Sequence, residues 1–283
     1  MKINLHNIKC NYSVFIIGTG ATGSQLLPFL SQLIANIKNR GHKITVIDGD
    51  HFEDKNMKNQ KCTYYDIGKS KAEILCERYS LVYPNLDISY IDNYIKSKDD
   101  IIKIISNRCT YNDIPVIVSC VDNNATRLIL NEVFYDKIFS DLIYIDSGNG
   151  TLNRNGQIVV GYKTKKEDNE IQYKDVINVE VYKVLAPVYD MFKKQIDNDN
   201  NDDIDAVTSC ARVSTDNPQN IATNIMAAST LFTILNELIS YDNINVHIAY
   251  FDAEESFVDI NKVKYESYKE RFNKDNLIYA YKK

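Results

Sequence analysis

A glycine pattern near the N-terminus is the first feature of the sequence that could do chemistry. The residues GTGATG occupy positions 18–23, between an apolar run at Val14–Ile17 that predicts a buried strand and a helical apolar pattern at Ser24–Ile37. In this setting Gly18 permits a tight turn, Gly20 lets the backbone approach a phosphate, and Gly23 lets the helix pack closely on the strand. Free N–H groups at the start of the helix then attract an anion. We expect this loop to bind a nucleotide, although a turn that only requires small residues would look similar.

An aspartate at the end of the second apolar run is the next candidate. Ile44–Ile47 predicts a strand, and Asp48 follows it directly, in the position from which a carboxylate can hold a ribose hydroxyl. Dehydrogenases carry an acid at the same place. The glycine loop and Asp48 therefore leave an NAD-dependent oxidoreductase open as one alternative.

Three further polar residues stand where they could contact a ligand. Asp122 comes directly after the apolar run Ile114–Val121, so we expect it at the edge of the sheet where ligands bind. Asp50 either binds the nucleotide or caps the turn that follows it. Arg127 either contacts a phosphate or forms an ion pair within the protein.

The elements that must position these residues follow from the periodicity of apolar residues. Apolar runs predict strands at residues 14–17, 44–47, 86–91, 114–121 and 142–145, and helical spacing predicts helices at 24–37, 69–83, 101–105 and 125–139, the first closed by Gly41. Strands that alternate with helices in this way form parallel βαβ units. We therefore expect an α/β fold, Rossmann-like and doubly wound, with a mainly parallel sheet.

The pattern changes after residue 150. Gly156–Tyr162 and Val246–Phe251 are typical of additional C-terminal strands. Asn217 and Pro218 predict the start of a helix with the apolar stripe Ile221, Ile225, Phe232, Leu235 and Ile239. Residues 163–205 are rich in charged and amide side chains and can bury little apolar surface over most of their length. We interpret the chain as a single domain, residues 1–283, with a polar insertion or crossover segment at 163–205.

Five segments, in order, resemble the signature elements of the ThiF/MoeB/HesA adenylyltransferases, which are relatives of the ubiquitin-activating enzymes. They are ITVIDGDHFEDKNMKNQ at 44–60, DIGKSKAEI at 66–74, SCVDNNATRLILN at 119–131, DSGNGTLNRNGQIVVG at 146–161, and TSC at 208–210. The last is followed by a long predicted helix. Coincidence is a poor explanation for five elements in the correct order. Within the family, the fourth and fifth segments look most like the ThiF-type proteins of plasmid-borne PRTRC cassettes.

The resemblance implies an ATP- and Mg2+-dependent adenylyltransferase that forms a homodimer. Its substrate would be the C-terminal carboxylate, usually of a glycine, of a small ubiquitin-like protein or peptide. By the same resemblance Asp48 would hold the ribose, Asn56 and Lys71 would bind phosphate, and Asp122 would hold Mg2+. The nucleotide site would comprise Gly18, Gly20, Gly23, Asp48, Asp50, Asn56, Gln60, Lys71, Asp122 and Asn123.

One position departs from the family pattern. Asn59 stands where the family carries an arginine, and an asparagine brings no charge to the phosphates. Arg154 or Arg212 could supply that charge instead. A cysteine at the place of Cys210 can accept an acyl group or sulfur in the family. The catalytic residues that we expect are Lys71, Asp122, Asn59 and Cys210, and the alternative function is a catalytically degenerate nucleotide-binding scaffold of the same fold.

Composition argues against several other classes of protein. The 283 residues carry a formal net charge of −5 without a dense basic stripe, so we expect no nucleic-acid partner. No segment reaches the roughly 20 apolar residues of a membrane-spanning helix, and the N-terminus is a poor signal peptide. We therefore expect a cytoplasmic protein. The six cysteines form no CxxC pair and the four histidines lack ligand spacing, which argues against a disulfide framework and a structural zinc site.

Overall fold

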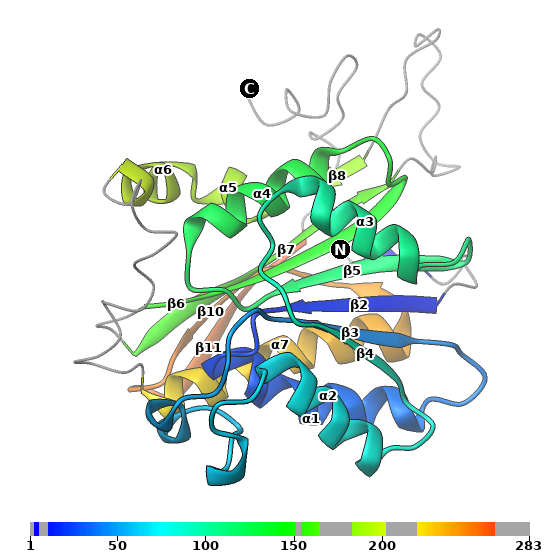
Figure 1. Cartoon of the computed structure of the whole chain (residues 1–283). Coiled ribbons are helices and arrows are strands. Elements are labelled where there is room, and N and C mark those ends of the chain that lie inside the picture. The colour runs from blue at the N-terminus through cyan, green and yellow to red at the C-terminus, as the bar shows by residue number, and fades with distance from the viewer. Residues whose placement is uncertain (1–2, 6–10, 151–153, 165–182, 202–219, 264–283) are drawn as a thin grey trace, which may run out of the picture.

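The parallel half of the central sheet contains the strands that the apolar runs predict (Figure 1). In this computed structural model, which describes residues 3–5, 11–150, 154–164, 183–201 and 220–263, they are β2 (Asn11–Ile17), β3 (Lys43–Ile47), β4 (Asp87–Ile91), β5 (Asp113–Ser119) and β6 (Asp141–Asn149). Their spatial order is β4-β3-β2-β5-β6, and every neighbouring pair is parallel. The order reverses at β2, so β2 and β5 flank the switch point at which such sheets bind ligands.

Antiparallel strands extend the sheet beyond β6. They are β7 (Asn155–Thr164), β8 (Lys183–Leu185), β10 (Val246–Asp252) and β11 (Phe257–Lys262). β7 pairs with β6, β8 and β10, and β11 forms the outer edge beside β10. A separate short pair joins β1 (Ile3–Asn4) to β9 (Asn243–Ile244). The expected Rossmann-like α/β fold with additional C-terminal strands is confirmed.

Helices cover both faces of the sheet (Figure 1). One face carries α1 (Ala21–Asn36), α2 (Lys71–Val82) and α7 (Ile221–Tyr241), and the other carries α3 (Lys98–Arg108), α4 (Asn124–Tyr135), α5 (Val188–Met191) and α6 (Lys193–Asn201). Two short 3-10 helices, η1 (Asp54–Lys58) and η2 (Tyr64–Asp66), lie between β3 and α2. Because helices pack on both faces, β2 and β5 are buried over almost their whole length, which explains their near-continuous apolar sequences.

α7 is the one helix among the described residues that is long and apolar enough to cross a membrane by length and composition. This differs from the expectation that no segment qualifies. The helix lies against α1, β7 and β10, and its buried side chains are Thr223, Asn224, Ala227, Ala228, Leu231, Leu235, Leu238 and Ile239. It is therefore packed as a core helix of the α/β domain.

Several boundaries differ from the sequence-based expectations. α1 was expected at 24–37 and closed by Gly41. It begins earlier, at Ala21, and ends at Asn36 because Ile37 adopts an extended backbone, so Gly41 does not close it. Asn220 caps the described start of α7 through a bond from Ala222 N at 2.8 Å, whereas Asn217 and Pro218 lie outside the described residues.

The boundaries of the predicted insertion and of the α7 stripe also need correction. Lys163 and Thr164 are buried in β7, so the polar segment begins after them. Ile221 and Ile225 were expected in the apolar stripe of α7, but they are 46% and 43% exposed. The fully buried apolar residues of α7 begin at Ala227, six residues after Ile221, and continue through Ala228, Leu231, Leu235, Leu238 and Ile239.

Candidate functional site

The glycine loop joins β2 to α1 and is shaped by three different constraints. Gly18 has a φ of 86°, a conformation that side chains strongly disfavour. A Cβ atom on Gly23 would lie 2.0 Å from the carbonyl oxygen of Gly18, so only glycine lets α1 start this close to the turn. A Cβ atom on Gly20 would meet nothing within 4 Å. The backbone at Gly20 therefore borders open space at the N-terminus of α1, where free N–H groups can bind an anion.

Asp48, directly after β3, is fixed against this loop. Its Oδ2 atom accepts hydrogen bonds from the backbone N (2.6 Å) and the hydroxyl (2.8 Å) of Thr19, and its Oδ1 atom accepts one from the backbone N of Asp50 at 2.9 Å. Burial raises the pKa of Asp48, and the nearby Lys71 ammonium opposes that shift. The carboxylate is thus oriented before any ligand arrives, and its remaining lone pairs can accept a hydrogen bond from a hydroxyl group.

A buried lysine stands beside the two aspartates. Lys71 is the first residue of α2 and is 6% exposed, and its Nζ atom lies 3.1 Å from Asp50 Oδ2. Two backbone bonds, from Phe52 N to Lys69 O and from Lys71 N to Asp50 O (both 2.9 Å), hold the start of α2 against the segment after β3. The sequence-distant Asp50 and Lys71 are therefore brought together by local backbone pairing.

Tyr94 completes this arrangement, and sequence reasoning missed it. The residue lies just beyond β4, and its hydroxyl donates a hydrogen bond to Asp50 Oδ1. Partial burial would raise the pKa of Asp50, but the bonds from Tyr94 and Lys71 outweigh it and lower that pKa. An aromatic residue after a predicted strand carries no motif, so the sequence offers no signal for this contact.

The 3-10 segment after Asp50 packs against the start of α1. Asn56 is 6% exposed, and its Oδ1 atom accepts a bond from Glu53 N at 2.8 Å, which caps η1. Gln25 Nε2 donates to Asn59 O at 3.3 Å. Gln60 follows with its Oε1 atom buried and without a hydrogen-bond partner. The segment thus contacts the first turns of α1. It brings an unsatisfied acceptor at Gln60 but no charged group at position 59.

The segment after β5 separates its candidate residues by role. Asp122 is exposed just beyond β5, at the same edge of the sheet as the glycine loop. The side chain of Asn123 accepts a bond from Thr126 N at 2.8 Å and caps α4. The side-chain oxygen Oδ1 of Asn123 is therefore occupied by a structural hydrogen bond, whereas the side chain of Asp122 faces solvent.

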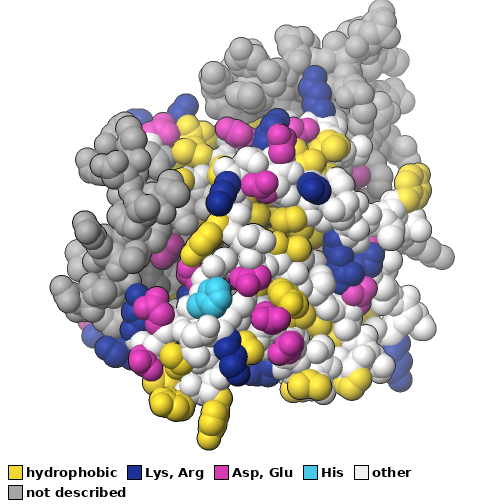
Figure 2. Space-filling model, in the orientation of Figure 1, with side chains coloured by type: hydrophobic (Ala, Val, Ile, Leu, Met, Phe, Trp, Pro, Cys, Tyr) yellow, Lys and Arg dark blue, Asp and Glu magenta, His cyan; other side chains and the backbone are white. Residues whose placement is uncertain are grey.

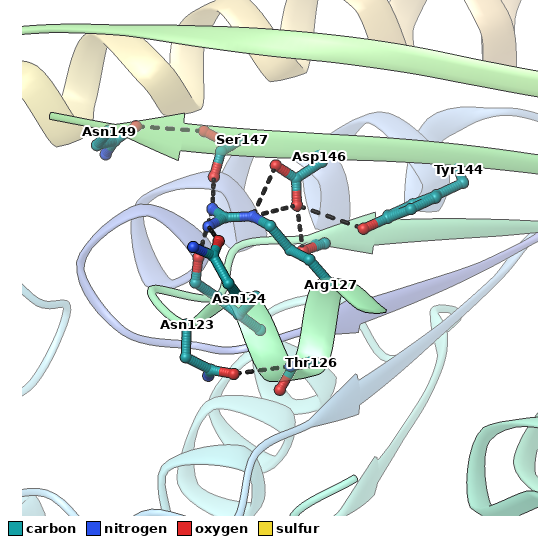
Figure 3. A network of polar contacts seen from close by, with 10 residues as sticks. Asn123, Asn124, Thr126, Arg127, Tyr144, Asp146, Ser147 and Asn149 are labelled. Atoms are coloured by element: carbon teal, nitrogen blue, oxygen red, sulfur yellow. Dashed lines mark hydrogen bonds and ion pairs between the residues drawn. The ribbon is translucent and has the colours of Figure 1, made fainter. Parts of the chain in front are cut away.

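Arg127 is the centre of a buried polar network (Figure 3). Its Nε atom lies 3.1 Å from both carboxylate oxygens of Asp146, and its two terminal nitrogens donate to Asn124 Oδ1 and to the backbone oxygen of Val121. Ser119 donates a further bond to Asp146 at 2.6 Å. Of the two roles open from the sequence, the structure therefore shows the ion pair, which holds the segment before Asp122 in place.

Asn149, at the end of β6, connects this network to two helices. Its Nδ2 atom donates to Thr22 Oγ1 in the first turn of α1 and to Asn224 Oδ1 in the first turn of α7, both at 2.9 Å. Ser147 joins Asn149 to the network around Arg127 at 3.4 Å (Figure 3). Asn149 lies in the family-like segment at 146–161, but no role was predicted for it, since its partners lie far away in the sequence.

The carboxylates suit a magnesium ion that is held mainly by a nucleotide. Among the described residues, no three His, Cys, Asp or Glu side chains gather into a group that could bind a metal ion alone. Mg2+ is usually held by one or two carboxylates together with substrate phosphates and water. The exposed carboxylate of Asp122, at the same edge as the glycine loop, fits that requirement.

The remaining predicted residues divide into those described and those outside the description. Arg154 is exposed at the start of β7. Burial raises the pKa of the Cys120 thiol, which suits a core residue and not a nucleophile. Cys210 and Arg212 lie outside the described residues.

Comparison with known proteins identifies the family and supports the fold. Residues 6–274 match the ThiF family, and the chain belongs to that family. Its fold is similar to that of E. coli MccB with AMPCPP and selenomethionine MccA, with a TM-score of 0.55, 18% identity, and coverage of 91% of this chain and 65% of that one. E. coli MccB with ATP has a TM-score of 0.55 and 17% identity, with coverage of 90% of this chain and 65% of that one. PaaA has a TM-score of 0.54 and 12% identity, with coverage of 89% of this chain and 64% of that one. The chain thus spans less than two thirds of these proteins, and no curated protein sequence matches it.

Proposed function

We propose that this protein uses ATP and Mg2+ to adenylate the C-terminal carboxylate of a small ubiquitin-like protein or peptide. The observation that carries the proposal is the position of Lys71, buried beside Asp48 and Asp50 and at the sheet edge that also holds the glycine loop and Asp122. Membership of the ThiF family supports it. So do the structures of the similar MccB with ATP, and with AMPCPP and MccA.

Each residue has a task in this chemistry. Asp48 accepts a hydrogen bond from a ribose hydroxyl, and the start of α1 binds phosphate through its N–H groups. Lys71 leaves Asp50 and neutralises phosphate charge. Asp122 would hold Mg2+, which neutralises charge on the phosphates. A carboxylate oxygen of the substrate attacks the α-phosphorus, an acyl-adenylate bond forms, and the bond to the bridging oxygen breaks as pyrophosphate leaves. Catalysis then consists mainly of positioning and charge stabilisation.

Two other functions explain fewer observations. An NAD-dependent oxidoreductase would use the glycine loop and Asp48 but gives no task to Lys71 or Asp122. A nucleotide-binding scaffold without turnover is favoured by Asn59, because an amide cannot supply the charge of the family arginine. The mixture of acidic and basic side chains on the described part of the face in Figure 2 offers no reason to add a nucleic-acid partner.

ATP–pyrophosphate exchange tests the proposal. Purified full-length protein is assayed with Mg2+, with and without small proteins or peptides that end in glycine. We expect exchange that requires the carboxylate substrate, that disappears in Asp122→Ala and that persists in Glu77→Ala, which removes an exposed acid from the middle of α2. If ATP binds but exchange is absent with every carboxylate substrate, the scaffold function replaces this one. NAD binding without ATP binding would favour the oxidoreductase.

The proposal extends to a homodimer and to Cys210. Attack of the Cys210 thiolate on the acyl carbonyl would release AMP and form a thioester. The same reaction mixture, separated with and without reducing agent, would show this thiol-sensitive adduct in the wild type and not in Cys210→Ser.

Sedimentation of the protein measures its molecular mass in solution and so tests the proposed homodimer directly.

A further inference from the structure

Tyr94 is held at two points beside the ribose carboxylate. A Cβ atom on Gly49, between Asp48 and Asp50, would lie 2.7 Å from Tyr94 Cδ2 and from its backbone N, so the ring rests directly on the backbone of Gly49. Its hydroxyl donates to Asp50. An aromatic ring fixed in this way loses little conformational freedom when a ligand packs on it.

The ring is nevertheless open to solvent. Tyr94 is 59% exposed, although contacts to Gly49 and Asp50 hold it in place. An exposed aromatic surface held rigidly at the edge of a ligand site is suited to stacking against a flat, aromatic group.

The order of the strands indicates which part of a nucleotide reaches Tyr94. The glycine loop follows β2, Asp48 follows β3, and Tyr94 follows β4, and these three strands are neighbours in that order. Phosphates at the glycine loop and a ribose at Asp48 define a direction along the sheet edge. Because the base is attached to the side of the ribose away from the phosphates, it extends onward towards the end of β4.

We infer that Tyr94 recognises the nucleotide base by stacking against it, while its hydroxyl keeps Asp50 in position beside Lys71. The inference rests on the proposed function, since it takes the bound nucleotide to be ATP. It assigns two separable tasks to one side chain. The ring provides base affinity, and the hydroxyl acts through Asp50 on the phosphate-binding lysine.

Equilibrium binding to the full-length protein separates these tasks. The ligands are Mg-ATP, adenosine and inorganic tripolyphosphate, and the variants are Tyr94→Leu and Tyr94→Phe. Tyr90→Leu is the matched control, since Tyr90 is also exposed but its hydroxyl contacts Glu73 at 2.9 Å, away from Asp50. We expect Tyr94→Leu to bind ATP and adenosine about tenfold more weakly than Tyr94→Phe, because stacking on one aromatic residue contributes on this order. Both variants lack the hydroxyl, so they should bind tripolyphosphate equally. Tyr94→Phe should keep the adenosine affinity.

Two results would overturn the inference, and they differ from failure of the proposed function. Wild-type affinity for adenosine in Tyr94→Leu would show that the ring does not contact the base. Equal adenosine affinities in Tyr94→Leu and Tyr94→Phe, both below that of the wild type, would show that Tyr94 acts only through the shape of the site. If the wild-type protein binds tripolyphosphate but neither ATP nor adenosine, both the inference and the proposed function are wrong.

Discussion

At the scale of single residues, Lys71 is the most informative position in the site. Its ammonium group is buried and paired with Asp50, yet the proposed chemistry requires it to turn to phosphate. Asp50 can release it at low cost, because its side chain is 50% exposed and Tyr94 also binds it. The lysine is therefore placed to exchange one anionic partner for another.

Replacing Lys71 by methionine should affect phosphate binding specifically. Methionine preserves most of the buried aliphatic length and removes the charge. We expect ATP to bind at least tenfold more weakly and the exchange rate to fall further, whereas adenosine should bind as in the wild type because it carries no phosphate. Isothermal titration with both ligands measures this. Lys69→Met is the control, since Lys69 is exposed two residues earlier. An equal loss for adenosine would contradict a phosphate role for Lys71.

At the scale of elements, α1 and α7 are joined through Asn149. Both hydrogens of its amide are used, one on Thr22 and one on Asn224, whose side chain is fully buried. The first turn of α1 carries the N–H groups that bind phosphate in the proposed function. Its position therefore depends on a bond to the end of β6 and, through Asn149, on α7.

Asn149→Ala should destabilise the protein and weaken ATP binding together. Removing the amide leaves Asn224 Oδ1 buried without its donor, which costs about 1–3 kcal/mol in the free energy of unfolding. Urea denaturation measures that loss. Thr22→Val should reproduce part of it, while Thr22→Ser, which keeps the hydroxyl, should not. A double-mutant cycle of Asn149→Ala with Thr22→Val should be non-additive, and additive effects would show that the two residues do not act through one contact.

The strands and helices were predictable to the extent that one face or both faces of an element are apolar. β2, β3 and β5 are buried on both sides and appear in the sequence as continuous apolar runs. The predicted stripe of α7 is confirmed at Phe232, Leu235 and Ile239 but is wrong at Ile221 and Ile225, because periodicity alone cannot show that these two side chains at the start of the helix are exposed.

The site was predictable only where it follows a motif. The roles of Gly18, Asp48 and Lys71 were predicted from their motifs. Asn149 also lies in a recognisable segment, but it reaches Thr22 across 127 positions and Asn224 across 75. No local pattern encodes a contact of that separation. The assignment of Arg127 to an ion pair likewise depended on finding Asp146 beside it in space.

At the scale of the whole molecule, the two edges of the sheet differ in character. The carboxyl edge holds the groups that can bind a ligand, while the amino edge holds a buried polar cluster that ties β2 and β3 to the end of α7. Tyr12 OH donates to Asp242 Oδ1 at 2.8 Å, Arg40 pairs with Asp242 at 2.7 Å, and His42 Nδ1 accepts a bond from Tyr12 N at 2.9 Å. This edge has a structural role and contains a titratable group.

The protein should become less stable as pH falls, because of His42. Burial, assisted by the charge of Arg40, lowers the pKa of His42 to about 4, while Asp242 and Asp113 only partly oppose the shift. The folded state therefore keeps the ring neutral, whereas the unfolded chain takes up a proton below its ordinary pKa of about 6.5. Stability from this group is fully present above pH 6.5 and is lost as pH falls towards 4, by roughly 3 kcal/mol in the free energy of unfolding.

Denaturation between pH 7 and 4.5 isolates this effect, because carboxylates whose pKa is lowered, such as Asp113, lose their contribution only at lower pH. His42→Asn keeps an acceptor for Tyr12 N but cannot titrate, so its stability should vary much less with pH in this range, although it should be lower at pH 7. His51→Asn is the control, since His51 is exposed, and it should follow the wild-type curve. A pH dependence in His42→Asn as steep as that of the wild type would mean that the acid sensitivity arises elsewhere in the molecule. If the expected difference is seen, the acid sensitivity of the fold arises at the amino edge, away from the proposed ligand site, so loss of fold and loss of binding can be measured separately.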